Sequence, residues 1–187
     1  PSEESFMARN PLIRVTAIEN YVRGLLAETD DLRHKFLTQA VRMEPDYSAA
    51  HFRLGLLHYG RREFKLAVPW FAKVQPGYAR YREALFYLGI CRFQQQDLVG
   101  AQLVFDKLSR DIPLNEVLSN FGVTQSRLNQ PEALATLEKV IESEPGDPVY
   151  LFNLGYALWK RGRFEEGAKR LQDVLDRDPN DQEAKEL

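Results

Sequence analysis

Residues 150–164 read YLFNLGYALWKRGRF, and this stretch determines how the rest of the sequence is interpreted. It contains an apolar-Gly step at Leu154-Gly155, then a turn glycine, Gly162, and an aromatic residue, Phe164. The apolar-Gly step occurs four times, at spacings of 34, 33 and 33 residues: Leu54-Gly55, Leu88-Gly89, Phe121-Gly122 and Leu154-Gly155. A period of this length is typical of proteins that repeat one supersecondary unit.

A second set of positions follows each apolar-Gly step. Eleven or twelve residues after each glycine stands a small residue, with larger apolar residues four and seven positions later. Offsets of four and seven lie on one face of a helix, so each unit is predicted to be a hairpin of two amphipathic helices. Small residues are needed where the two backbones approach, and large ones fill the space beside them. The small residues are Ala67, Ala101, Ala133 and Gly167; the larger ones are Phe71, Phe105, Leu137 and Leu171, then Val74, Leu108, Val140 and Val174.

This pattern resembles the tetratricopeptide repeat, in which about 34 residues form a helix–turn–helix. Residues 150–164 are similar to the first helix and turn of that family, including the turn glycine and the aromatic residue that opens the second helix. The resemblance implies an all-α fold, a right-handed α-solenoid of about five helix-turn-helix repeats.

The repeat pattern also predicts the domain organisation. We expect a flexible N-terminal segment at residues 1–10 and a single superhelical domain at residues 11–187. Its parts are a degenerate repeat at 11–47, four repeats at 48–81, 82–114, 115–147 and 148–181, and the start of a truncated capping helix at 182–187.

Two residues depart from the pattern. Arg33 occupies the small-residue position of the degenerate repeat, so that hairpin should either splay or send the guanidinium to solvent along its apolar stem. Pro69 lies inside the second helix of repeat 48–81 and should kink it if it falls beyond the first turn.

Charge and hydropathy exclude two classes of partner. The 187 residues carry a net charge of −2, which disfavours nucleic-acid binding, including RNA binding by helical repeats, because such binding needs clustered Lys and Arg. The longest charge-free stretch, residues 148–159, is shorter than the roughly 18 apolar residues that a membrane-spanning helix needs, so no membrane insertion is expected. Charge is unevenly distributed: residues 1–94 hold 14 Lys and Arg against 10 Asp and Glu, and residues 95–187 hold 11 against 17.

No motif predicts an enzyme, a cofactor or a metal site. The sequence has no Gly-rich phosphate loop and no nucleophile motif. His51 and His58 are seven residues apart, a spacing that can bind a metal, but no Cys or carboxylate stands at ligand spacing, which favours packed, hydrogen-bonded histidines. The single cysteine, Cys91, is predicted to be a small core residue; it permits no internal disulfide and assigns no compartment.

The resemblance implies that the first helices of the repeats line a concave groove. In the family, the groove residues flank the apolar-Gly step. Carried onto this sequence, they are Phe52, Arg53, Tyr59, Phe86, Tyr87, Phe93, Ser119, Asn120, Ser126, Arg127, Phe152, Asn153, Tyr156, Trp159 and Lys160. Three aromatic pairs seven residues apart should form ridges: Phe52/Tyr59, Phe86/Phe93 and Phe152/Trp159. The serine pair Ser119/Ser126 should open a shallower, polar site between the ridges.

We therefore expect a protein–protein interaction scaffold that binds an extended or helical partner peptide in this groove, with the aromatic residues as anchors. Asn120 and Asn153 stand at equivalent positions and can hydrogen-bond a peptide backbone. The competing interpretation is that the same aromatic and asparagine side chains pack against neighbouring repeats.

Two further alternatives concern the kind of partner. A clamp for a terminal carboxylate is disfavoured because Arg53, Arg127 and Lys160 are dispersed, whereas an anionic segment near the basic residues 61–82 stays open. The second functional hypothesis is self-assembly into a homo-oligomer, in which the basic first half of one copy meets the acidic second half of another.

Overall fold

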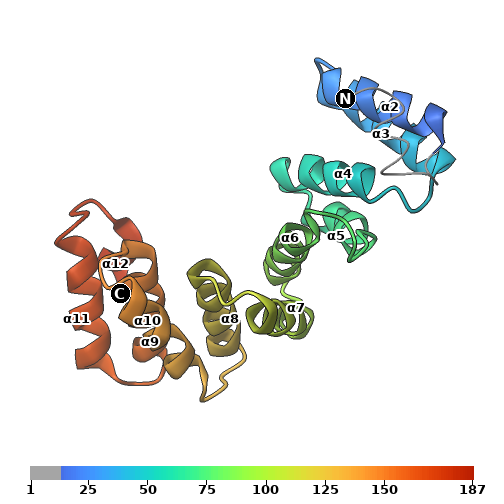
Figure 1. Cartoon of the computed structure of the whole chain (residues 1–187). Coiled ribbons are helices and arrows are strands. Elements are labelled where there is room, and N and C mark those ends of the chain that lie inside the picture. The colour runs from blue at the N-terminus through green and yellow to red at the C-terminus, as the bar shows by residue number, and fades with distance from the viewer. Residues whose placement is uncertain (1–13) are drawn as a thin grey trace. The chain divides into compact units, whose positions relative to one another are not determined.

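The computed structural model describes residues 14–187, and its regular structure is entirely helical. Among these residues eleven helices follow one another through short turns, and no strand occurs (Figure 1). This confirms the all-α prediction. None of the helices in this part of the chain combines the length and apolarity that crossing a membrane requires. The expected flexible segment at 1–10, and residues 11–13 of the degenerate repeat, lie outside the described residues.

The chain divides into two compact units, Pro1–Gln95 and Gln96–Leu187. The boundary falls in the turn between the two helices of the expected repeat 82–114. The expectation of one superhelical domain over residues 11–187 stays a prediction, and the two units are described in turn.

The described part of the first unit holds two helical hairpins and the first helix of a third. Helix α4 packs on α3, and α6 packs on both α4 and α5. Residues from three successive helices, α2 to α4, share one buried core that includes Ala17, Leu37 and Leu54. The helices are α2 (Val15–Leu26), α3 (Asp30–Met43), α4 (Ser48–Gly60), α5 (Phe64–Ala72) and α6 (Tyr81–Gln94).

Close approach between the helices of a hairpin occurs at the glycine of the apolar-Gly step. A Cβ atom added at Gly55 in α4 would lie 2.6 Å from Cε1 of Phe71 in α5, so no larger residue fits there without displacing the ring. In the degenerate repeat the same role falls to Gly24, whose added Cβ would lie 2.9 Å from the side chain of Leu37.

The degenerate hairpin therefore does not splay at Gly24, and Arg33 is accommodated at its edge. The Arg33 side chain is half-buried, pairs with Asp30, and donates from Nη2 to the carbonyl oxygen of Ala27 at 3.0 Å. The structure is closer to the expectation that the guanidinium of Arg33 reaches solvent, but this group also binds the carbonyl oxygen of Ala27.

Pro69 is the sixth residue of α5 and lies beyond the first helical turn. Because proline has no N–H, the bond to the carbonyl of Lys65 cannot form. Helix α5 has nine residues and is the shortest second helix of a repeat in the described chain.

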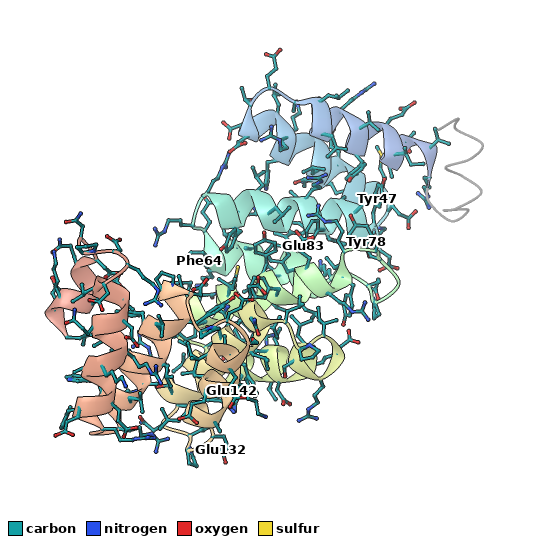
Figure 2. The ribbon with its side chains drawn as sticks, turned by 60° about the vertical axis from the view of Figure 1, so that its left-hand side comes forward. Tyr47, Phe64, Tyr78, Glu83, Glu132 and Glu142 are labelled. Atoms are coloured by element: carbon teal, nitrogen blue, oxygen red, sulfur yellow. The ribbon has the colours of Figure 1, made fainter. Side chains whose placement is uncertain are left out.

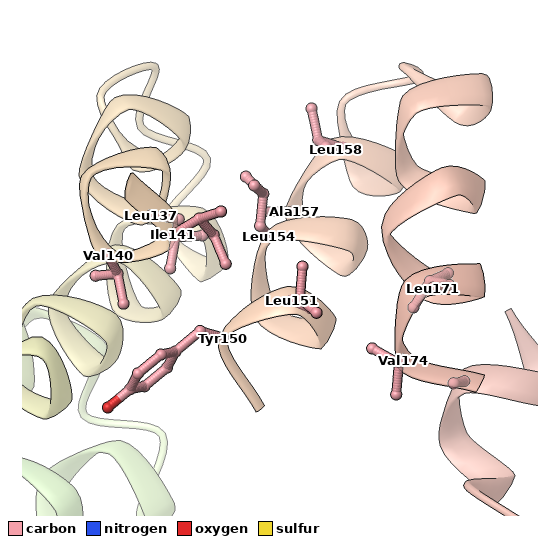
Figure 3. Packing of buried hydrophobic residues seen from close by; sticks show 11 residues of the cluster. Leu137, Val140, Ile141, Tyr150, Leu151, Leu154, Ala157, Leu158, Leu171 and Val174 are labelled. Atoms are coloured by element: carbon pink, nitrogen blue, oxygen red, sulfur yellow. The ribbon is translucent and has the colours of Figure 1, made fainter. Parts of the chain in front are cut away.

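The second unit contains the remaining helices, and its core lies between α9, α10 and α11. Figure 3 shows Leu137 and Val140 from α9, Leu154 from α10, and Leu171 and Val174 from α11 meeting in this core. All are almost fully buried, and burial stabilises each by roughly 1.5–3 kcal/mol. The helices are α7 (Leu98–Asp111), α8 (Asn115–Arg127), α9 (Ala133–Ser143), α10 (Pro148–Lys160), α11 (Phe164–Leu175) and α12 (Gln182–Glu186).

The turns inside four of the repeats share one backbone conformation. In each, the second residue after the first helix has a positive φ, a region that L-residues rarely adopt. These residues are Arg62 (58°), Gln96 (63°), Asn129 (57°) and Gly162 (76°). The sequence pointed to this turn only in the last repeat, where it has a glycine.

Candidate functional site

Three aromatic side chains form a stack along one face of α10. The rings of Phe152 and Tyr156 have centroids 6.4 Å apart and planes 11° apart, and those of Tyr156 and Trp159 are separated by 6.3 Å and 26°. Spacings of four and three residues place them on the same side of the helix. Trp159 is 39% exposed, and the other two are half-buried. We call these three residues the aromatic stack.

Two residues from neighbouring helices extend the aromatic stack. Phe164, at the start of α11, meets Trp159 edge-on with a centroid distance of 6.3 Å and is itself 60% exposed. The guanidinium carbon of Arg127 in α8 lies 5.9 Å from the ring centroid of Tyr156, a cation–π arrangement. The groove prediction missed Phe164 because it considered only first helices.

The polar residues beside the aromatic stack bind one another across α8 and α10. Asn153 Nδ2 donates to Ser119 Oγ at 3.0 Å, and Lys160 Nζ donates to the carbonyl oxygen of Ser126 at 3.1 Å. Ser119 and Ser126 are buried. The prediction that they form an open polar site is wrong, because both serines are buried; Asn153 binds the Ser119 hydroxyl, and Lys160 binds the backbone carbonyl of Ser126.

Asn120 and Asn153 do not have equivalent partners, although their positions are equivalent. Asn120 Nδ2 donates within its own helix, to the carbonyl oxygen of Glu116 at 2.7 Å, whereas Asn153 Nδ2 bonds across to α8. Both amide groups are therefore already engaged as donors inside the chain.

In the first unit, aromatic residues mainly join helices to one another. Phe52 is 0% exposed, with its ring 6.0 Å from those of both Phe71 and Tyr78. The prediction that Phe52 contacts a ligand is wrong, because its ring is enclosed by α5 and the loop that follows it. Tyr59 of α4 and Tyr87 of α6 have centroids 4.8 Å apart and are both half-buried.

The other predicted residues of the first unit are partly accessible. Phe86 and Phe93 are half-buried on α6, and Arg53 is half-buried on α4 beside a cleft. Figure 2 shows Tyr47 and Tyr78 at the same end of this unit, where burial raises the pKa of both phenols. A single groove running through both units stays a prediction.

His51 is a buried core residue. Its Nε2 lies 2.6 Å from the carbonyl oxygen of Pro45, and its ring stacks on Trp70 at a centroid distance of 5.8 Å. Burial lowers the pKa of His51 and outweighs the opposing effect of the Pro45 carbonyl.

His58 is also buried and hydrogen-bonded, as predicted, but it has a carboxylate neighbour. Its Nδ1 lies 2.7 Å from Glu63 Oε2 in the following turn, and its ring meets His34 edge-on. The spacing argument missed Glu63 because the turn, not a helix face, brings it back. No group of three or more His, Cys, Asp or Glu among residues 14–187 is placed to hold a metal ion.

Comparison with known families agrees with these hairpins. Models of the tetratricopeptide repeat match residues 33–82, 83–113 and 131–187. The chain belongs to the tetratricopeptide repeat family. No curated protein matches the sequence.

Solved structures share the fold of this tetratricopeptide repeat protein. One is YrrB, described as a TPR protein with an unusual peptide-binding site, with a TM-score of 0.80 and 17% identity over 100% of this chain and 99% of that one. A second is MamA residues 41-end from Desulfovibrio magneticus RS-1, with a TM-score of 0.76 and 14% identity over 91% of this chain and 99% of that one. Another MamA structure has a TM-score of 0.77 and 16% identity over 90% of this chain and 94% of that one. At these identities the likeness concerns the fold.

Proposed function

We propose that this protein is a protein–protein interaction scaffold whose aromatic stack binds a peptide segment of a partner. The observation that carries the proposal is the ordered row of Phe152, Tyr156 and Trp159, continued by the largely exposed Phe164. Large rings that stay accessible on a rigid helix bury much apolar area at little entropic cost, which is why aromatic residues dominate binding hot spots.

The surroundings of the aromatic stack indicate what the peptide should offer. An apolar groove of about 410 Å³ opens beside Trp159 and Phe164 and is lined further by Leu171, Leu175 and Leu187. A large aliphatic or aromatic side chain would displace water from it, so we propose that the peptide is anchored there by one apolar residue. The proposal assigns no catalytic step and no nucleic-acid partner to the chain.

The experiment that tests this proposal begins with peptides selected from a displayed library on the whole chain. Tyr156→Ala and Trp159→Ala should each weaken binding of a selected peptide by at least about 30-fold, measured by fluorescence anisotropy. The matched control is Leu103→Ala, which removes a 65% exposed apolar side chain from the second helix α7. Equal losses of peptide affinity in all three variants, or no loss in Tyr156→Ala and Trp159→Ala, would overturn the proposal.

A second candidate function is self-assembly, which the apolar groove of α10–α12 also favours. Helix α2 carries exposed apolar residues, Val22, Leu25 and Leu26, that need cover of the same kind. The surplus of basic residues in positions 1–94 and of acidic residues in 95–187 would favour contact between opposite ends of two copies. Sedimentation velocity across protein and salt concentrations tests it, and a monomer under every condition would dispose of it.

A further inference from the structure

A second cleft lies in the first unit, where α2, α3 and α4 meet. Its volume is about 560 Å³, within the range of ligand-binding clefts. Leu25 and Leu56 contribute apolar wall, and three arginine residues, Arg33, Arg53 and Arg61, line the same space. We call it the arginine cleft.

The carboxylate on the wall of this cleft, Asp30, is already shared by two arginines. Arg33 pairs with Asp30 and also binds the carbonyl oxygen of Ala27. Arg61 places Nε 3.3 Å from Asp30 and Nη2 3.2 Å from Asp31. The positive charges of Arg33 and Arg61 are thus balanced within the chain.

Arg53 differs from these two. Among the residues that the structure describes, it forms no ion pair, and its Nε atom is shielded from solvent without a hydrogen-bond acceptor. A guanidinium is permanently charged and has no acceptor atoms of its own. The shielded Nε–H is not itself open to a ligand, but no carboxylate of the described chain pairs with Arg53, so a ligand carboxylate at the rest of its guanidinium would form a charge-assisted pair.

We infer that the arginine cleft binds a partner peptide through an Asp or Glu side chain that adjoins a large apolar residue. The carboxylate accepts hydrogen bonds from Arg53, whose planar fork matches two carboxylate oxygens. The apolar neighbour packs on Leu25, 41% of which is exposed, and on Leu56. This inference rests on the proposed function only in taking a peptide as the ligand.

The test is a titration of the ¹⁵N-labelled protein with acetyl-Leu-Glu-Leu-amide, followed by the Nε–H resonance of Arg53. Saturable movement of that resonance is expected. Acetyl-Leu-Gln-Leu-amide should bind at least about tenfold more weakly, since it has no charged acceptor. A third peptide, acetyl-Leu-Gln-Leu with a free terminal carboxylate, separates the two sources of a carboxylate.

Substitutions test whether the preference for the Glu peptide arises in the arginine cleft. Arg53→Gln should abolish the difference between the Glu and Gln peptides, whereas Arg23→Gln, which removes an exposed charge from α2, should leave it unchanged. The thermal transition of each variant, followed by circular dichroism, confirms that it is folded. Equal affinity for the Glu and Gln peptides, an unchanged difference in Arg53→Gln, or tightest binding of the free terminal carboxylate would overturn the inference. None of these outcomes bears on the aromatic stack, which belongs to the other unit.

Discussion

Gly167 of α11 lies against the backbone of α10, so closely that a Cβ atom at Gly167 would be 2.9 Å from the carbonyl oxygen of Gly155. Backbone faces backbone at this point, and neither side can rotate away as a flexible side chain can. Alanine occupies the corresponding place in three other repeats, Ala67, Ala101 and Ala133, and all three are buried. The last hairpin is thus packed more tightly there than the repeat pattern requires.

Gly167→Ala should therefore lower the free energy of unfolding by about 1–3 kcal/mol, because overpacking outweighs the gain of about 1 kcal/mol in helix propensity. Gly60→Ala is the matched control, since nothing lies within 4 Å of its added Cβ, and it should be neutral or stabilising. Urea unfolding followed by circular dichroism measures both. Stabilisation by both variants would contradict the close approach.

A glycine at a positive-φ position of these turns should stabilise the protein. Arg62→Gly should raise the free energy of unfolding by up to about 1 kcal/mol, because its φ of 58° is costly for a residue with a Cβ. Gly162→Ala should lower it by about 1 kcal/mol, since Gly162 has a φ of 76°. Gly77→Ala, outside the positive-φ turns and with open space around it, is the control. A loss in Arg62→Gly as large as that in Gly162→Ala would contradict this account.

Stability should fall as the pH drops from about 7.5 to about 5.5. Burial lowers the pKa of His51 below its ordinary value of 6.5, and burial, with His58 adding to it, lowers that of His34. Across this range the unfolded chain then binds more protons than the folded chain, so the free energy of unfolding rises with pH.

His51→Gln keeps a side-chain N–H donor for the Pro45 carbonyl and removes the titration. The pH dependence of its denaturant midpoint should be smaller than that of the unaltered protein. The same dependence in both proteins would show that His51 is not the group responsible.

Tyr59 and Tyr87 should couple successive repeats of the first unit. Their rings lie 4.8 Å apart across α4 and α6, and such pairs contribute about 0.5–1.5 kcal/mol beyond their buried area. A double-mutant cycle with Tyr59→Leu and Tyr87→Leu measures the coupling directly. Additive losses would mean that the two rings only fill space.

Cys91 should report on unfolding of the first unit. The thiol is buried, and burial raises its pKa to about 12. Its reaction with a disulfide reagent at neutral pH should be at least about a hundredfold slower than that of glutathione, because the thiolate is the reacting form. In urea above the unfolding transition the two rates should converge, and rapid reaction of the folded protein would contradict burial.

Much of the fold could be predicted because its signals are local. The small residue at Ala67 and the large ones at Phe71 and Val74 are buried where the helical period places them. Arg62 and Gln96 gave no such signal, since their side chains do not favour the backbone conformation that the turn imposes on them.

The candidate site was less predictable. The positions of Tyr156 and Trp159 on one helix face follow from their spacing, and both lie in the aromatic stack. Phe164 joins them only because the turn folds α11 back along α10.

The sequence by itself determined that the chain forms helical hairpins of one kind, since the size of each side chain at a fixed helical spacing sets how two adjacent helices pack. Only the tertiary structure decided which side chains a partner can reach. Phe52 is enclosed, Ser119 is bound by Asn153 from 34 residues away, and Arg53 Nε lacks an acceptor. Accessibility and hydrogen-bond satisfaction depend on neighbours one repeat away in the sequence, which no local pattern encodes.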